Sequence, residues 1–112
     1  NGVLAHANHL VDPKETGVAE PENPRRRLSE FRHKRMEELL NEQKPINVEA
    51  MQEILKDHEH QPQSLCRHRD DTLPESQHTI TKTAMIMDLE ERKMWVTDGQ
   101  PCKAKFEEFA LN

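Results

Sequence analysis

Two short motifs carry side chains that could bind zinc: His6-x-x-His9 near the start of the chain and Cys66-x-His68 in its second half. Together they supply four ligands of suitable type. Side chains three positions apart point to opposite faces of a strand, and the residues around His6 and His9 do not resemble a helix. Residues 57–60 (DHEH) could bind a metal loosely, but the end of a helix favours exposure to solvent. We therefore expect neither a metal nor another cofactor.

The two cysteines, Cys66 and Cys102, are also candidates for nucleophilic catalysis. A nucleophilic cysteine needs an adjacent base and a lowered pKa. Arg67 and His68 follow Cys66, but neighbours along a strand point away from each other. Cys102 follows Pro101 at a turn and has no acid–base partner nearby in the sequence. Neither thiol is therefore predicted to act as a nucleophile.

Asn8 stands in the apolar stretch 2–11 (GVLAHANHLV), which we predict to be a buried strand. On a strand, Leu4, His6, Asn8 and Leu10 would share one face. Polar side chains inside an apolar strand need hydrogen-bond partners, because an unpaired buried amide or imidazole is costly. Ordinary structural hydrogen bonds are therefore the alternative to a functional role for Asn8 and its neighbouring histidines.

The composition limits the class of protein. The chain has 112 residues, a formal net charge of −5 and 33% hydrophobic residues, so we expect one domain at most, with a thin core. No apolar run is long enough to span a membrane and no signal peptide is visible, so we expect reduced thiols in the cytoplasm. The sequence does not begin with Met and is apolar from Val3, from which we expect the C-terminal part of a longer protein. The alternative is a complete small α+β domain.

Basic residues cluster at 25–27 (RRR) and 32–35 (RHKR), and Glu37 and Glu38 follow directly. A nucleic-acid interface would combine a basic surface with interleaved aromatic residues. The net charge is negative, and Phe31 is the aromatic residue nearby. The pattern therefore predicts a solvated helix face, and we expect no nucleic-acid partner.

The clearest secondary-structure signal comes from a run rich in threonine, isoleucine, methionine and valine, which favour strands. We predict a β-hairpin with strands at 79–89 and 94–97, a turn at 90–93 and a second turn at 98–99. Apolar residues occur on both faces near the middle of the first strand. This pattern is typical of a sheet that is covered on both sides.

Two helices are predicted between the N-terminal strand and the hairpin. Asn23 is expected to cap the first, with Pro24 at its first position, and this helix runs to about Asn41. Asn47 caps the second, which ends near residues 57–60. We expect an antiparallel helix pair on one face of an antiparallel sheet, and hence an α+β fold. The remaining segments are predicted loops at 12–24 and 61–77 and a strand or extended tail at 104–111.

Five short segments resemble, in their order along the chain, the acyl-coenzyme A:6-aminopenicillanic acid acyltransferase family. This family includes fungal isopenicillin N acyltransferase and the insect β-alanyl-amine hydrolases, and it belongs to the N-terminal-nucleophile hydrolases. The matching segments span essentially the whole chain. They are 6–9 (HANH), 57–58 (DH), 66–68 (CRH), 79–88 (TITKTAMIMD) and 99–102 (GQPC).

The resemblance implies a four-layer αββα sandwich, of which this chain would be the C-terminal part. In such enzymes autocatalytic cleavage exposes a cysteine as a new N-terminus, and its own α-amino group serves as the general base. The thiol attacks an amide or thioester carbonyl to form an acyl-enzyme, and water or an amine then takes the acyl group. The implied partners are a small-molecule amide or acyl-thioester substrate and the upstream part of the same protein.

The resemblance also implies roles for individual residues. Asn8 matches the oxyanion-hole asparagine of the family, and Arg67 matches an arginine beside the nucleophile and its amino terminus. His6, His9 and His68 would support these groups. The nucleophilic cysteine would lie upstream of this sequence, so the chain alone is expected to be inactive.

The alternative function is that of a non-catalytic interaction module, with the helix pair as a docking surface. The two interpretations differ over Asn8 and Arg67. An enzyme brings both side chains to one end of the sheet, pointing into a cleft, whereas a docking module has no reason to do so. We predict that they converge, and their location on opposite faces of the sheet would contradict the catalytic interpretation.

Overall fold

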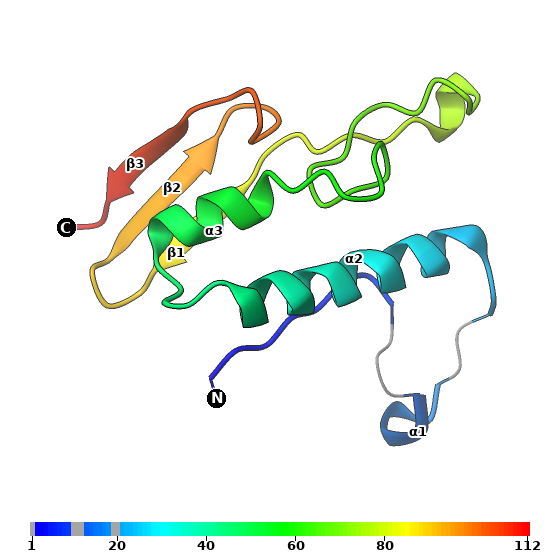
Figure 1. Cartoon of the computed structure of the whole chain (residues 1–112), viewed down its shortest axis with the longest axis horizontal. Helices are drawn as coiled ribbons and strands as arrows, with labels where there is room; N and C mark the ends of the chain where they lie inside the picture. Colours follow the sequence, from blue (N-terminus) through cyan, green and yellow to red (C-terminus); the bar gives the residue numbers. More distant parts are fainter. Residues whose placement is uncertain (1, 10–12, 19–20) are drawn as a thin grey trace. The chain divides into compact units, whose positions relative to one another are not determined.

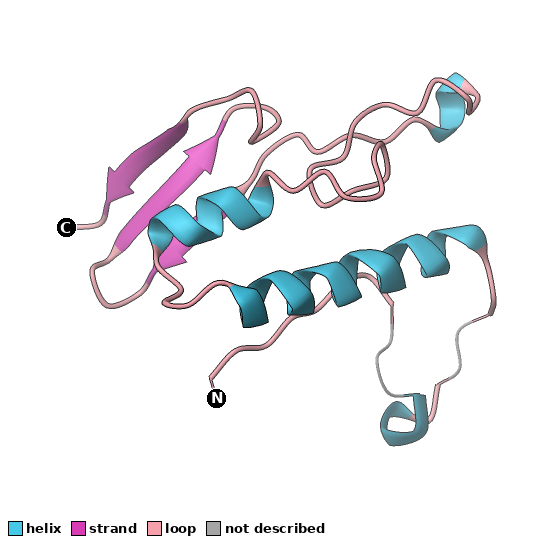
Figure 2. Cartoon of the chain, in the orientation of Figure 1, coloured by secondary structure: helices cyan, strands magenta, loops and turns pink. Residues whose placement is uncertain are grey.

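The computed structural model describes residues 2–9, 13–18 and 21–112. The chain divides into two compact units, Asn1–Lys44 and Pro45–Asn112. The first unit contains helices α1 (Pro13–Thr16) and α2 (Pro24–Glu42), and the second begins with helix α3 (Val48–Leu55). The second unit continues with a 3-10 helix, η1 (Glu75–Gln77), and the strands β1 (Met85–Asp88), β2 (Lys93–Thr97) and β3 (Phe106–Ala110) (Figures 1 and 2). The observed classes of element confirm the α+β prediction.

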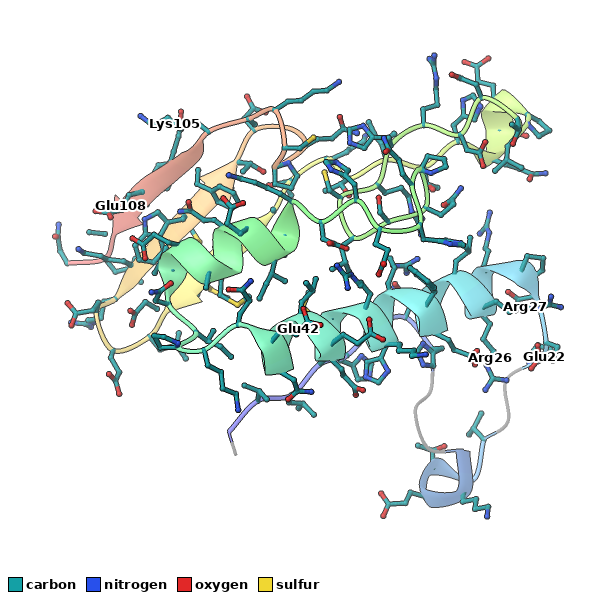
Figure 3. The ribbon with its side chains drawn as sticks, viewed as in Figure 1. Glu22, Arg26, Arg27, Glu42, Lys105 and Glu108 are labelled. Carbon is teal, nitrogen blue, oxygen red and sulfur yellow. The ribbon has the colours of Figure 1, made fainter. Side chains whose placement is uncertain are left out.

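Helix α2 begins where the sequence predicts. The side chain of Asn23 accepts a hydrogen bond from the main-chain N–H of Arg26 at 2.9 Å, and Pro24 occupies the first turn. Such a cap satisfies one of the N–H groups that a helix leaves unpaired at its start. Arg26 also forms ion pairs with Glu22 and Glu30, at 3.7 Å and 3.0 Å (Figure 3 labels Arg26 and Glu22). The basic cluster therefore lies on a helix surface where carboxylates neutralise part of its charge.

The predicted N-terminal strand is not present in the described residues 2–9, and Leu10 and Val11 lie outside the described part of the chain. The segment instead makes its hydrogen bonds to α2: the main-chain N–H of Asn8 donates to Ser29 Oγ at 2.8 Å, and His33 Nε2 contacts the Ala5 carbonyl at 3.1 Å. Ala5 and His9 are buried, whereas the side chains between them at positions 6 and 8 are exposed. The segment therefore keeps much of the alternation of buried and exposed side chains that a strand shows. It pairs with no strand in the described part of the chain.

The predicted loop at 12–24 also needs a correction. Its described part contains the four-residue helix α1, which is followed by Gly17. Residue 12 lies outside the described part of the chain. Gly17 has a positive φ of 70°, a conformation that a residue without a Cβ adopts at little cost.

Helix α3 is capped by Asn47, as predicted, and its side chain accepts from the Ala50 N–H at 2.8 Å. The helix ends at Leu55, earlier than the predicted end near residues 57–60. The reason is a competing partner, because the carbonyl of Asp57 accepts a hydrogen bond from the Cys66 N–H at 3.1 Å and not from a next helical turn. Ile54, only 1% exposed, anchors the helix in the core of this unit.

The three strands form an antiparallel sheet in the order β1-β2-β3. The hairpin prediction is confirmed, with Met85 opposite Val96 and Asp88 opposite Lys93. The Asp88 side chain accepts hydrogen bonds from the N–H groups of two turn residues, which fixes the tight connection to β2. The tail, predicted to be a strand or extended, forms β3 and pairs with β2.

Two features of the hairpin prediction were wrong. Residues 79–84 are not part of β1, which begins at Met85. Thr81 hydrogen-bonds to the loop at Arg67, and the Ala84 N–H donates to the side-chain hydroxyl of Thr97 and not to a main-chain carbonyl of β2. Within the described residues of the second unit, the sheet is also not covered on both faces. Ile86 is buried on the face where α3 contacts β1, but Met85, Met87 and Phe109 on the opposite face are 50–62% exposed.

The predicted helix pair would consist of α2 from the first unit and α3 from the second. Because the two helices belong to different units, this pairing stays a prediction. Within the described residues, no helix combines the length and the apolar character that crossing a membrane requires.

Buried Thr97 joins the end of β2 to the segment that precedes β1. Its hydroxyl accepts from the Ala84 N–H at 2.8 Å and donates to the Gly99 carbonyl at 2.7 Å, and the residue is only 1% exposed. We predict that Thr97→Val lowers the free energy of unfolding by about 1–3 kcal/mol, because the buried Ala84 N–H and the partly buried Gly99 carbonyl both lose their partner. Trp95 fluorescence during urea denaturation measures this loss.

The matched control is Thr83→Val, since Thr83 is exposed and its hydroxyl donates to the Thr97 carbonyl. We expect that substitution to change the free energy of unfolding by less than about 0.5 kcal/mol. Equal losses in the two variants would contradict the special role of the Thr97 hydroxyl.

Candidate functional site

The loop after α3 is held by hydrogen bonds to its own main chain. Its centre is fully buried, with Ser64 and Cys66 both at 0% exposure. The Ser64 hydroxyl donates to the Cys66 carbonyl at 2.6 Å, and the His68 N–H donates to the Pro62 carbonyl at 3.0 Å. These contacts fix the loop without a regular secondary structure and present Cys66, Arg67 and His68 in a defined conformation.

The main chain of Arg67 joins two further segments to this loop. Its N–H donates to Thr81 Oγ1 at 2.8 Å, and its carbonyl accepts from the Thr81 N–H at 3.0 Å. The same carbonyl accepts from Gln100 Nε2 at 2.9 Å. Segments 66–68, 79–88 and 99–102, which are far apart in the sequence, therefore meet at one residue. Sequence reasoning did not identify Thr81 or Gln100 as the residues that make this junction.

The guanidinium of Arg67 donates from Nη1 to Thr79 Oγ1 at 2.9 Å. The side chain is partly buried, and this burial lowers the pKa of the guanidinium because it disfavours the charged form. In the described part of the chain, no carboxylate forms an ion pair with Arg67. The result is a positioned, partly desolvated cation that could bind an anion.

Four metal-ligand side chains gather beside this loop: His58, Cys66, His68 and Cys102. Their ligand atoms all lie within 4.8 Å of one another. The centre of the group is His68 Nε2, which is 3.0 Å from His58 Nε2, 3.3 Å from Cys102 Sγ and 3.7 Å from Cys66 Sγ. Neither cysteine forms a disulfide.

This cluster differs from the combination that the sequence suggested. His6 is exposed and His9 is buried against Ser29, so the two diverge, as their spacing indicated. Cys66 and His68 do lie together, because residues two apart on an extended chain share a face. Cys102 has no acid–base partner nearby in the sequence, yet the fold brings it to His68, 34 residues away. Sequence spacing alone carries no signal for such a contact.

The pKa shifts of Cys66 and His68 both favour the neutral form of the side chain. Burial raises the pKa of the Cys66 thiol to about 11. Burial, the nearby His58 and the charge of Lys103 lower the pKa of His68. A catalytic thiolate–imidazolium pair needs the opposite directions. That Cys66 is not a nucleophile stays a prediction.

The amide of Asn8 has a fixed orientation in the first unit. Its Oδ1 accepts a hydrogen bond from Arg32 Nη2 at 3.0 Å, which identifies the oxygen end of the amide, and its main-chain N–H is held by Ser29. The residue is exposed. His9 Nδ1 contacts the same Ser29 Oγ at 2.8 Å, and Ser29 is only 2% exposed. Ser29 and Arg32, which sequence reasoning did not single out, therefore position the candidate donor.

Asn8 belongs to the first unit and Arg67 to the second. Their predicted convergence therefore stays a prediction. His9 contacts the residue that holds Asn8, whereas His68 belongs to the cysteine–histidine cluster.

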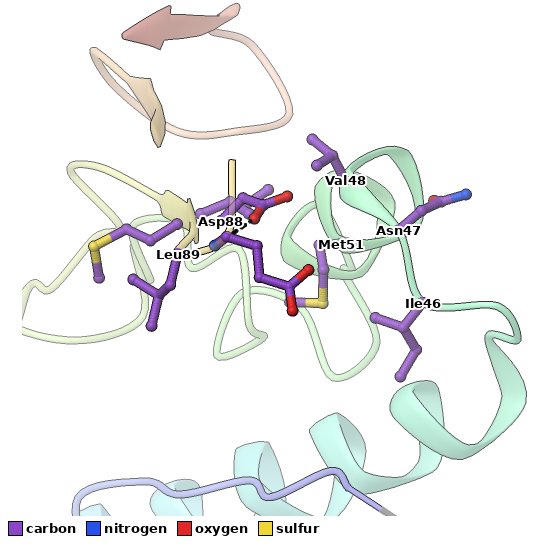
Figure 4. Close-up of a pocket in the computed structure, with 9 residues that line it drawn as sticks. Ile46, Asn47, Val48, Met51, Asp88 and Leu89 are labelled. Carbon is purple, nitrogen blue, oxygen red and sulfur yellow. Dashed lines mark hydrogen bonds between the residues drawn. The ribbon is translucent and has the colours of Figure 1, made fainter. Parts of the chain in front are cut away.

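A shallow pocket lies between the start of α3 and the end of β1 (Figure 4). Its lining includes Ile46, Met51 and Met87, with carboxylates from Asp88 and Glu90. None of the candidate site residues lines it. The pocket therefore adds nothing to the chemistry of the Arg67 loop.

Ser29 is the buried hydrogen-bond partner shared by Asn8 and His9. We predict that Ser29→Ala weakens the attachment of residues 2–9 to α2 by about 1–3 kcal/mol, because both groups lose their partner. Hydrogen exchange of residues 2–9 and α2, followed by mass spectrometry, measures this loss as faster exchange. Ser76→Ala in exposed η1 is the matched control and should leave this exchange unchanged. Unchanged exchange in Ser29→Ala would contradict the role of the Ser29 hydroxyl.

Comparison with known proteins gives one family. The sequence model of the family described as acyl-coenzyme A:6-aminopenicillanic acid acyl-transferase matches residues 1–103. No curated protein sequence gives a significant match to the chain. The matched range includes every residue of the Arg67 junction, the cysteine–histidine cluster and the segment around Asn8.

Proposed function

Because the chain belongs to the acyl-coenzyme A:6-aminopenicillanic acid acyl-transferase family, we propose that it is the C-terminal portion of a cysteine N-terminal-nucleophile enzyme. The enzyme would cleave or transfer an acyl group from a small amide or a thioester. The observation that carries this proposal is the family match over residues 1–103, which includes both Asn8 and Arg67. The α+β elements of the two units are compatible with part of such a fold.

In the proposed reaction the nucleophile is a cysteine upstream of this sequence, exposed as an N-terminus by cleavage of the preceding peptide bond. Its α-amino group takes the thiol proton, and the sulfur attacks the substrate carbonyl. The tetrahedral intermediate expels the amine or thiol, which receives that proton, and leaves a thioester on the enzyme. Water or an acceptor amine then attacks the thioester and regenerates the free cysteine.

Asn8 would stabilise the negative charge that develops on the carbonyl oxygen. An oxyanion donor must be fixed before the reaction, because it then needs no reorganisation as the charge forms. The contact from Arg32 to the amide oxygen supports this role, since it leaves Nδ2 as the donor end of the side chain. The main-chain hydrogen bond to Ser29 restricts the backbone at the same residue.

Arg67 would contact the nucleophile and its surroundings. Its main chain is fixed by Thr81 and Gln100, and its guanidinium has no ion-pair partner in the described part of the chain. A guanidinium in this setting stabilises an adjacent thiolate or orients a substrate carboxylate. Neither Cys66 nor Cys102 replaces the missing nucleophile in this proposal, so the chain alone would be inactive.

The test is Asn8→Asp in the full gene product that contains this chain. The substitution keeps an oxygen for Arg32 but replaces the Nδ2 donor with an acceptor. We predict that kcat for amide or thioester substrates falls roughly 10²–10³-fold, while the melting temperature is retained. Steady-state kinetics and thermal denaturation measure the two quantities.

The matched control is Asn41→Asp, which makes the same chemical change at an exposed position of α2. It should leave both kcat and the melting temperature unchanged. An Asn8→Asp enzyme with unchanged turnover would contradict the oxyanion role. A parallel loss of turnover and stability would assign Asn8 a structural role instead.

A further inference from the structure

The group of four metal-ligand side chains carries a second inference, which is independent of the catalytic proposal. We propose that His58, Cys66, His68 and Cys102 bind a zinc ion that fixes the loop against the turn at 99–102. Two imidazoles and two thiolates are a donor set typical of structural zinc. The ligands come from three separate segments: the chain after α3, the buried loop and the turn that follows β2.

The distances fit tetrahedral coordination. Zn–N bonds of about 2.0–2.1 Å and Zn–S bonds of about 2.3 Å place neighbouring ligand atoms of a tetrahedron roughly 3.3–3.8 Å apart. From His68 Nε2, the measured separations are 3.0 Å to His58 Nε2, 3.3 Å to Cys102 Sγ and 3.7 Å to Cys66 Sγ. All four ligand atoms lie within 4.8 Å of one another, so shifts of a few tenths of an ångström to about an ångström complete the geometry.

Hydrogen bonds alone do not account for this arrangement. A single imidazole nitrogen carries either one N–H group or one lone pair, so it can make one good hydrogen bond. His68 Nε2 nevertheless has three polar neighbours within 3.7 Å, one nitrogen and two sulfurs. A cation at the centre of the four atoms gives each of them a bond to the same ion, and no group then needs to share a proton.

The site would be structural and not catalytic. Four protein ligands fill all the positions of a tetrahedral zinc ion and leave none for water or substrate. Binding would convert both thiols to thiolates and release two protons, so the bound form carries two Zn–S and two Zn–N bonds. Ser64 and the main-chain hydrogen bonds of the loop would hold the ligands in position from outside the metal.

A metal at this place would also compensate for a small core. In the second unit, the buried apolar side chains are few: Ile54, Cys66, Ala84, Ile86 and Pro101. Small domains with such cores gain folding free energy from a structural metal. The zinc ion would lie next to the Arg67 junction, because Cys66 and His68 flank Arg67 in the chain. It would therefore stabilise the conformation of that loop.

Cobalt substitution tests the proposal directly. The full chain, purified in reductant and freed of metal by a chelator, is titrated with Co²⁺ and then with Zn²⁺. We expect one equivalent of Co²⁺ to give the intense visible bands of tetrahedral cobalt and a thiolate-to-cobalt charge-transfer band, and Zn²⁺ to abolish both. Metal analysis after dialysis should find one zinc per chain. A weak octahedral spectrum, or no zinc retained after dialysis, would overturn the proposal.

Single-ligand variants identify the site. Cys102→Ser and His58→Gln should each weaken Zn²⁺ binding by more than the roughly 10–100-fold that loss of an outer partner costs. The control is His60→Asn, which replaces an exposed neighbouring histidine with a residue that tolerates its positive φ of 68°. Equal weakening by the control, or a Cys66–Cys102 disulfide in peptide maps of the protein isolated without reductant, would contradict the zinc site. The wild-type cobalt spectrum decides the question if a variant fails to fold.

Discussion

The second unit depends on the main chain of one residue, Arg67. Arg67 lies outside every helix and strand, yet both of its main-chain groups form hydrogen bonds. The N–H donates to Thr81 Oγ1, and the carbonyl accepts from the Thr81 N–H and from Gln100 Nε2. Loss of a partner by a buried main-chain group would cost about 1–3 kcal/mol. The hydrogen bonds of Arg67 are therefore kept, and they hold three distant segments together. The loop after α3, the extended segment before β1 and the turn after β2 meet there. Regular secondary structure contributes little to this part of the molecule.

If both proposals hold, this one short loop would serve two purposes. Along an extended chain, successive side chains point to opposite sides. Cys66 and His68 therefore lie together in the metal-ligand cluster, whereas Arg67 directs its guanidinium to Thr79. A zinc ion bound on one side of the loop would stiffen the backbone, and this backbone positions the Arg67 guanidinium on the opposite side of the loop. Structural and catalytic roles would then be coupled through a single peptide segment.

The features that the sequence predicted well are local. Asn23 and Asn47 cap helices because a side chain there reaches an N–H group within the same turn, and the hairpin follows from alternation and turn residues. The features that failed involve distant partners. Residues 2–9 alternate like a strand, but in the described structure their hydrogen bonds go to α2. Cys102 meets His68 across 34 residues, which no local pattern encodes.

The candidate site likewise contains residues that the sequence suggested and residues that depend on distant contacts. Asn8 and Arg67 are candidates because they match residues of the family that the chain resembles, and both lie within the matched residues 1–103. The residues that hold them, Ser29, Arg32 and Gln100, became visible only in the structure. They carry no sequence signal of their own, because serine, arginine and glutamine occur commonly on surfaces and in loops.

In the proposed function, this chain is the downstream part of a self-processing enzyme. Intact-mass spectrometry of the purified gene product that contains it tests this claim most directly. We expect two fragments, with the downstream fragment beginning at a cysteine and containing all 112 residues of this sequence. A single uncleaved chain, or an upstream region without a cysteine that could become the new N-terminus, would contradict the proposed function.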